Sequence, residues 1–128
     1  MDKFLKEYHS HRFEDWGAYC SKDFKAFATK LKNYLERTLP GDCEIVKHRC
    51  GHYDLSGFIK HEDEYIYYSY SWDRFNPVDI WEDSCPRGVL VRHAASDRDY
   101  RGERNEFTSL EGLPEKIVEM FVRRCAAA

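Results

Sequence analysis

The spacing of apolar residues changes along the chain, from every third or fourth position to every second. Apolar side chains recur at helical intervals over Lys22–Leu39, which predicts a helix capped by Ser21. The same spacing predicts a short first helix or helical turn within residues 2–16 and a last helix over Pro114–Cys125. In the last helix we expect Ile117, Val118, Phe121 and Val122 to be buried, with Cys125 as a further candidate.

Alternation of two faces predicts strands in the middle of the chain. The expected strands are Cys43–Tyr53, Leu55–His61, Tyr65–Trp72 and Gly88–Ala94, with a brief return to the sheet over Glu106–Thr108. A bulge or bend is expected at Gly51 or Gly57. The acidic residues 62–64 are expected to form a hairpin loop, and residues 73–87, which contain Pro77 and Pro86, a longer loop.

This order of elements predicts an α+β fold in a single domain, residues 1–128. We expect an antiparallel sheet of about four strands with helices, two N-terminal and one C-terminal, packed mainly on one face. Each helix has only one apolar stripe to bury. The opposite face of the sheet then needs a loop, the first helix, a second copy or a partner to cover it.

The segment from Tyr65 to Trp72 is unusually aromatic, with four tyrosines and one tryptophan. Tyrosine and tryptophan are enriched at protein interfaces because they offer a large contact area and a polar group with few torsions to order. We therefore expect one face of this strand to be core and the other to be available to a partner.

Composition limits the class of protein without naming its function. The net charge is -3 and no long apolar run is present, so neither a nucleic acid nor a membrane is favoured globally. The five cysteines are widely spaced without a CxxC pair, and the chain starts with Met-Asp-Lys rather than an apolar signal segment. Reduced thiols and a cytoplasmic location are expected.

A metal site is one interpretation of the segment around His48. On a strand, His48, Cys50 and His52 point to the same side, and Cys43, His61 or Cys85 is available as a fourth zinc ligand. Structural zinc sites usually assemble from two ligand pairs, and this cluster has no second pair. We therefore favour ordinary strand residues and expect neither a metal nor a cofactor.

Catalysis and nucleic-acid binding are two further hypotheses for the function of the chain. The six histidines offer general bases, but some plausible pair is almost inevitable at that number, and no nucleophile elbow or phosphate-binding glycine loop occurs. Arg98, Tyr100, Arg101 and Arg104 interleave cations with a ring, although acidic residues sit between them. An RNA-binding or RNA-cleaving protein that uses His48, His52 and the Arg98–Arg104 loop is the alternative hypothesis.

The end of the aromatic strand is the strongest interface candidate. Trp72-Asp73-Arg74 places tryptophan and arginine, the residue types that dominate interface energies, at a strand exit. The same residues also suit a structural corner, and the interface and corner interpretations both stay open. The partner-binding residues predicted from the sequence are Tyr67, Tyr70, Trp72, Asp73, Arg74, Tyr100, Arg101, Glu62, Asp63 and Glu64.

Spaced residues over roughly positions 50 to 118 carry a resemblance. They are the Tyr-Ser-Tyr-Ser strand, Asp73-Arg74, Leu90–Ala94, Asp99–Gly102 with Asn105, and Ser109–Pro114. In this order they resemble small proteins carried by phages and other mobile elements of bacteria, some of which are anti-CRISPR inhibitors.

The resemblance implies a compact cytosolic protein that binds a host nuclease or its guide complex without a cofactor. Independently of it, we expect a monomer or a homodimer. In such inhibitors acidic side chains often stand where a nuclease expects phosphate. The candidates are Glu62, Asp63, Glu64, Asp79, Glu82 and Asp83. The small net charge favours a mixed surface of acids and rings over mimicry of a whole DNA duplex.

Overall fold

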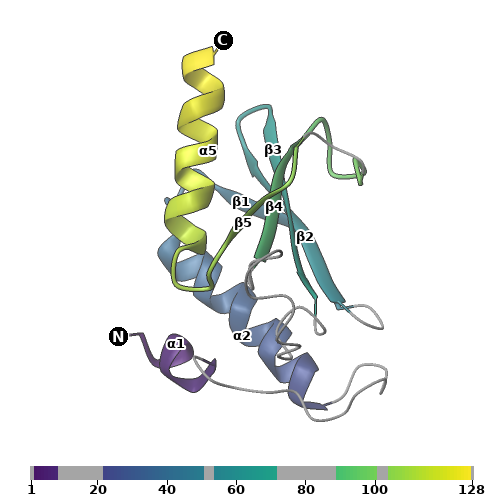
Figure 1. Ribbon diagram of the computed structural model, residues 1–128, viewed down its shortest axis with the longest axis vertical. Helices are drawn as coiled ribbons and strands as arrows, with labels where there is room; N and C mark the ends of the chain where they lie inside the picture. The colour runs from purple at the N-terminus through teal and green to yellow at the C-terminus, as the bar shows by residue number, and fades with distance from the viewer. Residues whose placement is uncertain (1, 9–21, 51–53, 72–88, 101–103, 128) are drawn as a thin grey trace, which may run out of the picture.

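The computed structural model describes residues 2–8, 22–50, 54–71, 89–100 and 104–127. Its elements are α1 (Lys3–Tyr8), α2 (Lys22–Thr38), β1 (Glu44–Cys50), β2 (Asp54–His61), β3 (Glu64–Ser71), β4 (Val89–Ala94), β5 (Glu106–Thr108) and α5 (Leu113–Ala127). The predicted α+β order is confirmed within these residues (Figure 1). The predicted cap Ser21 and the predicted loop 73–87 lie outside the described part of the chain.

The strands form one antiparallel sheet in the order β1-β2-β3-β4-β5. The short return at Glu106–Thr108 is therefore a true fifth strand, paired with β4. The expected bulge at Gly57 is wrong, since Gly57 pairs regularly with both neighbouring strands. The register shift lies instead on β1, between Ile45 and Lys47. Gly51 lies outside the described residues.

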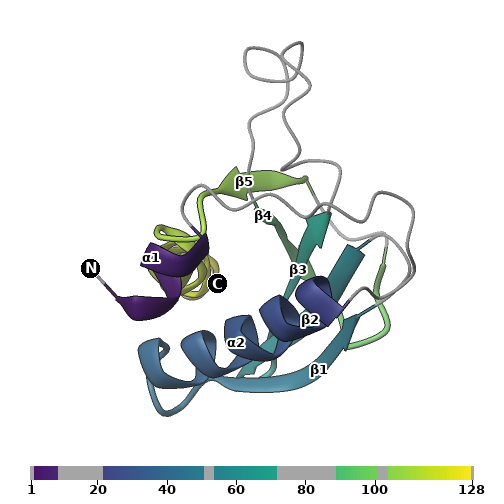
Figure 2. The same cartoon turned by 90° about the horizontal axis from the view of Figure 1, so that it is seen from below.

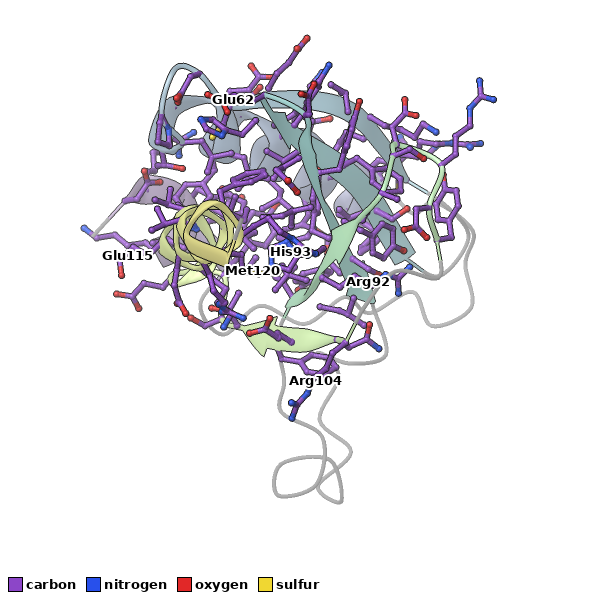
Figure 3. The ribbon with its side chains drawn as sticks, turned by 90° about the horizontal axis from the view of Figure 1, so that it is seen from above. Glu62, Arg92, His93, Arg104, Glu115 and Met120 are labelled. Atoms are coloured by element: carbon purple, nitrogen blue, oxygen red, sulfur yellow. The ribbon has the colours of Figure 1, made fainter. Side chains whose placement is uncertain are left out.

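The helices cover one face of the sheet, as Figures 1 and 2 show from two sides. Alternate residues of the central strands face them and join their apolar stripes in one core. Its fully buried side chains include Phe27, Leu31, Leu35, Leu55, Ile59, Ile66, Tyr68, Val89, Leu113, Ile117 and Met120. Figure 3 shows the alternation on β4, where His93 points toward α5 and Arg92 points to the other side.

Helix α1 is held against α2 by rings and by ion pairs. Phe4 stacks on Tyr34 with 4.8 Å between ring centroids. The Asp2 carboxylate accepts a hydrogen bond from the Phe4 N–H at 2.8 Å and pairs with Arg37 at 2.7 Å. These contacts place α1 on the same side of the sheet as α2. Among the described residues, no helix is long and apolar enough to span a membrane.

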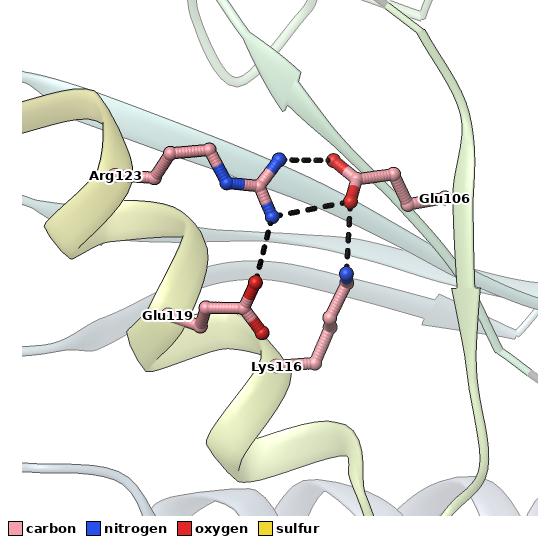
Figure 4. Close-up of polar contacts among 4 residues, drawn as sticks. All are labelled: Glu106, Lys116, Glu119 and Arg123. Atoms are coloured by element: carbon pink, nitrogen blue, oxygen red, sulfur yellow. Dashed lines mark hydrogen bonds and ion pairs between the residues drawn. The ribbon is translucent and has the colours of Figure 1, made fainter. Parts of the chain in front are cut away.

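Helix α5 is tied to the edge strand β5 by a cluster of charges around Glu106 (Figure 4). One Glu106 oxygen lies 2.8 Å from Nζ of Lys116, and the other lies 2.9 Å from a guanidinium nitrogen of Arg123. The hydrogen bond from Arg123 is the largest cause that lowers the pKa of Glu106, to about 2. Arg123 also pairs with Glu119, one helical turn away.

Glu106→Gln is expected to lower the free energy of unfolding by about 1–2 kcal/mol near neutral pH, because it leaves Lys116 and Arg123 without their shared anion. The ordinary pKa of 4.5 falls to about 2 in the folded chain. The stabilisation is therefore present above 4.5 and is lost as the pH falls toward 2. Urea unfolding at a series of pH values measures both effects.

Glu119→Gln is the matched control, since Glu119 is 61% exposed in its side chain and pairs only within its own helix among the described residues. We expect it to change stability by no more than about 0.5 kcal/mol. Equal losses for the two variants would contradict the role given to Glu106.

Candidate interaction surfaces

The face of the sheet opposite the helices carries a second, smaller apolar cluster. Phe58 of β2, Tyr67 of β3 and Ala94 of β4 are its buried members. Val46, Tyr65 and Leu90 pack around them and are partly exposed. We call this side of the sheet the helix-free face. Its tyrosines come from β3, the same aromatic strand that supplies Tyr68 to the main core.

The loop after β4 folds back over this cluster and places Tyr100 on it. The Tyr100 ring meets Phe58 and Tyr67 edge-on, at centroid distances of 5.3 Å and 5.8 Å. Such edge-to-face pairs contribute about 0.5–1.5 kcal/mol beyond their buried area. Tyr100 remains 47% exposed, so it is a fixed ring on the outer surface.

Two cations fasten the loop to the rings. The guanidinium of Arg92 lies 4.3 Å from the centroid of Tyr67 and donates to the backbone oxygen of Tyr100. The ammonium of Lys47 donates to the backbone oxygen of Asp97 at 2.8 Å and lies 5.8 Å from the centroid of Tyr100. Cation–π contacts of this kind contribute about 0.5–2 kcal/mol, depending on exposure. Both cations therefore stabilise the loop, and their donors are engaged by backbone oxygens of the chain rather than by a bound anion.

The predicted partner-binding residues that the structure describes fall into three groups. Tyr67 and Tyr100 are brought together, although Tyr67 is only 9% exposed. Tyr70 is 3% exposed and packs against Phe27 of α2 at 4.3 Å between centroids, so its predicted role at an interface is wrong. Glu62, Asp63 and Glu64 lie at the β2–β3 hairpin, the first two in its exposed turn and Glu64 in β3.

The remaining predicted residues are Trp72, Asp73, Arg74 and Arg101, and they lie outside the described residues. The acidic candidates Asp79, Glu82 and Asp83 do so too. Glu64 is 3.7 Å from Nε of Arg124, which leaves Glu62 and Asp63 as the two hairpin acids with no ion pair to the described chain.

His48 lies on the helix-covered side of the sheet, between β1 and α2. Its Nε2 is 2.8 Å from the carbonyl oxygen of Ala28, which can only accept, so Nε2 carries the proton. The neutral ring then accepts a hydrogen bond at Nδ1 from the Tyr68 hydroxyl, 2.5 Å away. Burial lowers the pKa of His48, which favours this neutral form.

These contacts occupy both nitrogens of His48 and leave neither free for a metal or for RNA cleavage. The partners come from α2 and β3, so the ring bridges the helix to the sheet. Within the described residues no three histidine, cysteine or acidic side chains are grouped to hold a metal ion. Of the predicted metal ligands, His52 and Cys85 lie outside those residues.

A hollow, which we call the α5 pocket, lies between α5 and the segments that follow α2 and end β2. It has a volume of about 310 Å³ and is lined by Pro40, Asp42, Cys43, His61, Val118, Phe121 and Val122. The expected burial of Val122 is wrong, because it is 62% exposed on the rim. The helical spacing of Val118 and Val122 was the available signal, but the pocket needs three distant segments that no periodicity brings together.

Asp42, Cys43 and His61 are the residue types of a nucleophile, base and acid set, but their geometry differs. His61 Nε2 lies 2.8 Å from a carboxylate oxygen of Asp42. Burial raises the pKa of the Cys43 thiol, and in the described chain no hydrogen bond joins it to His61. An activated cysteine needs a lowered pKa and an adjacent base. These three residues therefore line the pocket without the geometry of a catalytic set.

Comparison of the chain with protein-family models, with curated proteins and with solved structures finds no match. The two surfaces are thus described by their own chemistry. One is the helix-free face with Tyr100 packed on its rings, and the other is the α5 pocket beside the acidic hairpin.

Proposed function

We propose that the chain is a non-enzymatic protein-binding module whose partner docks on the helix-free face around Tyr100. The observation that carries the proposal is a half-exposed ring held rigidly by Phe58, Tyr67 and Lys47. A pre-ordered aromatic side chain loses little conformational entropy on binding, and such residues are the usual anchors of interfaces.

The arrangement of cations favours a protein over single-stranded RNA. Nucleobases stack on the open faces of rings, and phosphates need free cations. Arg92 lies over the Tyr67 ring, Lys47 lies beside Tyr100, and both donate to backbone oxygens. Arg98 and Arg104 are exposed, but acidic residues flank Arg98 in the chain. A surface with charges of both signs, whose cations are mostly engaged within the chain, suits a protein partner.

The biological setting of the proposal is inhibition of a bacterial nuclease or its guide complex. It rests on the resemblance to small proteins of phages and other mobile elements. The exposed acids Glu62 and Asp63 support it, because they stand at the end of a hairpin where they can reach a basic surface of a nucleic-acid-binding partner.

Tyr100→Ser is expected to weaken binding of the partner at least about tenfold, because it removes the anchoring ring. The assay is retention of nuclease subunits from a bacterial lysate on the immobilised protein, identified by mass spectrometry. Inhibition of DNA or RNA cleavage by each retained nuclease is then measured with the purified components.

Tyr100→Phe is the matched control, since it keeps the ring and its contacts with Phe58 and Tyr67, and it should retain most of the binding. Thermal unfolding of the variants checks that the fold is intact. Retention of no nuclease, or equal retention by the serine variant, would contradict the proposal. Binding of single-stranded RNA that falls steeply with salt and is lost in Tyr100→Ser would favour the RNA hypothesis instead.

A further inference from the structure

The α5 pocket is apolar inside and acidic outside. Val118, Phe121 and Val122 form its wall on α5, and Val122 is the most exposed large apolar side chain among the described residues. At the opposite wall the His61 ring lies 5.4 Å from the Phe121 ring. An exposed apolar hollow costs solvation free energy until something fills it.

The volume of the pocket limits what can fill it. At about 310 Å³ it lies at the small end of ligand sites, which suits one or two large side chains rather than a whole helix or a cofactor. A stable dimer buries about 1,200–2,000 Å² in total, far more surface than a hollow of this size supplies. The pocket therefore fits a single anchor from an otherwise shallow contact.

The charges around the mouth indicate the neighbours of that anchor. Asp42 lines the pocket, and its side chain is 67% exposed although it pairs with His61. The chain continues from His61 into the exposed turn residues Glu62 and Asp63, which have no ion pair with the described residues. The φ of 54° at Glu62 belongs to the tight turn that presents these two acids. Of the two arginines that follow Val122 on α5, Arg123 pairs with Glu106 and Glu119, and Arg124 faces Glu64 at 3.7 Å.

We infer that the α5 pocket binds a segment of a partner protein that inserts one apolar side chain, leucine or phenylalanine, next to a lysine or arginine. The apolar side chain is buried against Val118, Phe121 and Val122, and the cation meets Glu62 and Asp63. Burial supplies most of the affinity, and the charges supply orientation and selectivity. This site shares Glu62 and Asp63 with the proposed nuclease contact, but Tyr100 does not line it. Val122→Glu and Tyr100→Ser therefore distinguish failure of the pocket from failure of the helix-free face.

The test uses three short fluorescent peptides and the full chain. The first carries a leucine between arginines, the second carries the leucine between glutamates, and the third carries a serine between arginines. Fluorescence polarisation gives the affinities, and amide chemical shifts of the labelled protein locate the site. We expect the first peptide to bind at least about tenfold more tightly than either of the others and to shift the signals of His61 and Val122.

Variants separate the two contributions. Val122→Glu places a better helix former than valine at an exposed position and should abolish binding of the first peptide, whereas Val122→Leu should retain it. Glu62→Lys with Asp63→Lys should weaken it at least about tenfold. Glu111→Lys makes a charge change at the other end of α5, and should leave it within about twofold. An unchanged thermal midpoint of each variant checks the fold.

Several outcomes would overturn the inference. They are the absence of binding by the first peptide at millimolar concentration, equal affinity for all three peptides, shifts confined to residues outside the pocket, or no effect of Val122→Glu. A concentration-dependent dimer that Val122→Glu dissociates would also overturn it, because the occupant would then be a second copy of the chain.

Discussion

Replacing Gly57 with alanine is expected to lower the free energy of unfolding by at least about 3 kcal/mol, and at 37 °C the variant should be largely unfolded. Gly57 lies on β2 directly between His48 of β1 and Tyr68 of β3. A Cβ there would lie 2.6 Å from Cζ of Tyr68 and even nearer to its hydroxyl oxygen and to the Lys47 carbonyl oxygen. None of these atoms belongs to a flexible, exposed side chain.

The cost arises because the glycine leaves the space through which Tyr68 reaches His48. Tyr68 is fully buried, so its ring has no free volume to enter. The Lys47 carbonyl belongs to the paired backbone of β1, so moving it would disturb the sheet beside the register shift. A methyl group at position 57 must therefore displace the Tyr68 hydroxyl from His48 and separate the strands.

Gly41→Ala is the matched control, because a Cβ at Gly41 would meet no atom within 4 Å. We expect that change to alter stability by no more than about 0.5 kcal/mol, or to stabilise slightly through the unfolded chain. Urea unfolding followed by circular dichroism measures both variants. A Gly57→Ala protein as stable as Gly41→Ala would show that the space beneath Tyr68 is not needed.

The elements could be predicted from the sequence because each rests on a local period. The apolar stripe of α2 repeats at helical spacing over many residues, and the alternation of β3 is sustained over its whole length. Even the three-residue β5 is marked by the change from a polar stretch to Glu106–Thr108. Helices on one face follow because each helix has a single apolar stripe.

Contacts between distant segments could not be predicted in the same way. The pattern shows that Tyr67 and Tyr68 face opposite sides, but it does not show that Arg92 and Tyr100 cover the first. The glycine at position 57 indicates an irregularity, and from the sequence a bulge or bend is the natural interpretation. The actual reason for the glycine is its close approach to Tyr68, which lies on another strand. Tyr70 was assigned to an interface because its residue type is common there, whereas burial beneath α2 depends on the register of the sheet.

His48 shows how a polar residue in the sequence can be misread. Its neighbours Cys50 and His52 favour metal or acid–base chemistry, whereas its actual partners are a helix carbonyl and a tyrosine from another strand. Both are a long way along the chain from His48. The structure gives this histidine a structural role that leaves a measurable trace in the pH dependence of stability.

The wild-type protein is expected to lose stability as the pH falls below about 6.5, and His48→Gln should lose much less. Burial lowers the pKa of His48 below its ordinary value of 6.5. Between the lowered pKa and 6.5 the unfolded chain binds a proton that the folded chain does not. Stability is therefore full above 6.5 and declines as the pH falls toward the folded pKa, by at most about 1.4 kcal/mol per pH unit.

Glutamine removes the titration and can keep both hydrogen bonds, with its amide N–H donated to Ala28 and its oxygen accepting from Tyr68. His61 and His93 remain in both proteins, so the difference between the two stability curves isolates His48. Tyr68→Phe should cost about 1–3 kcal/mol near neutral pH, because the buried Nδ1 then has no donor. Parallel curves for the wild type and His48→Gln would mean that His48 titrates alike in the folded and unfolded chains, and its bridge between α2 and β3 would not be the neutral one.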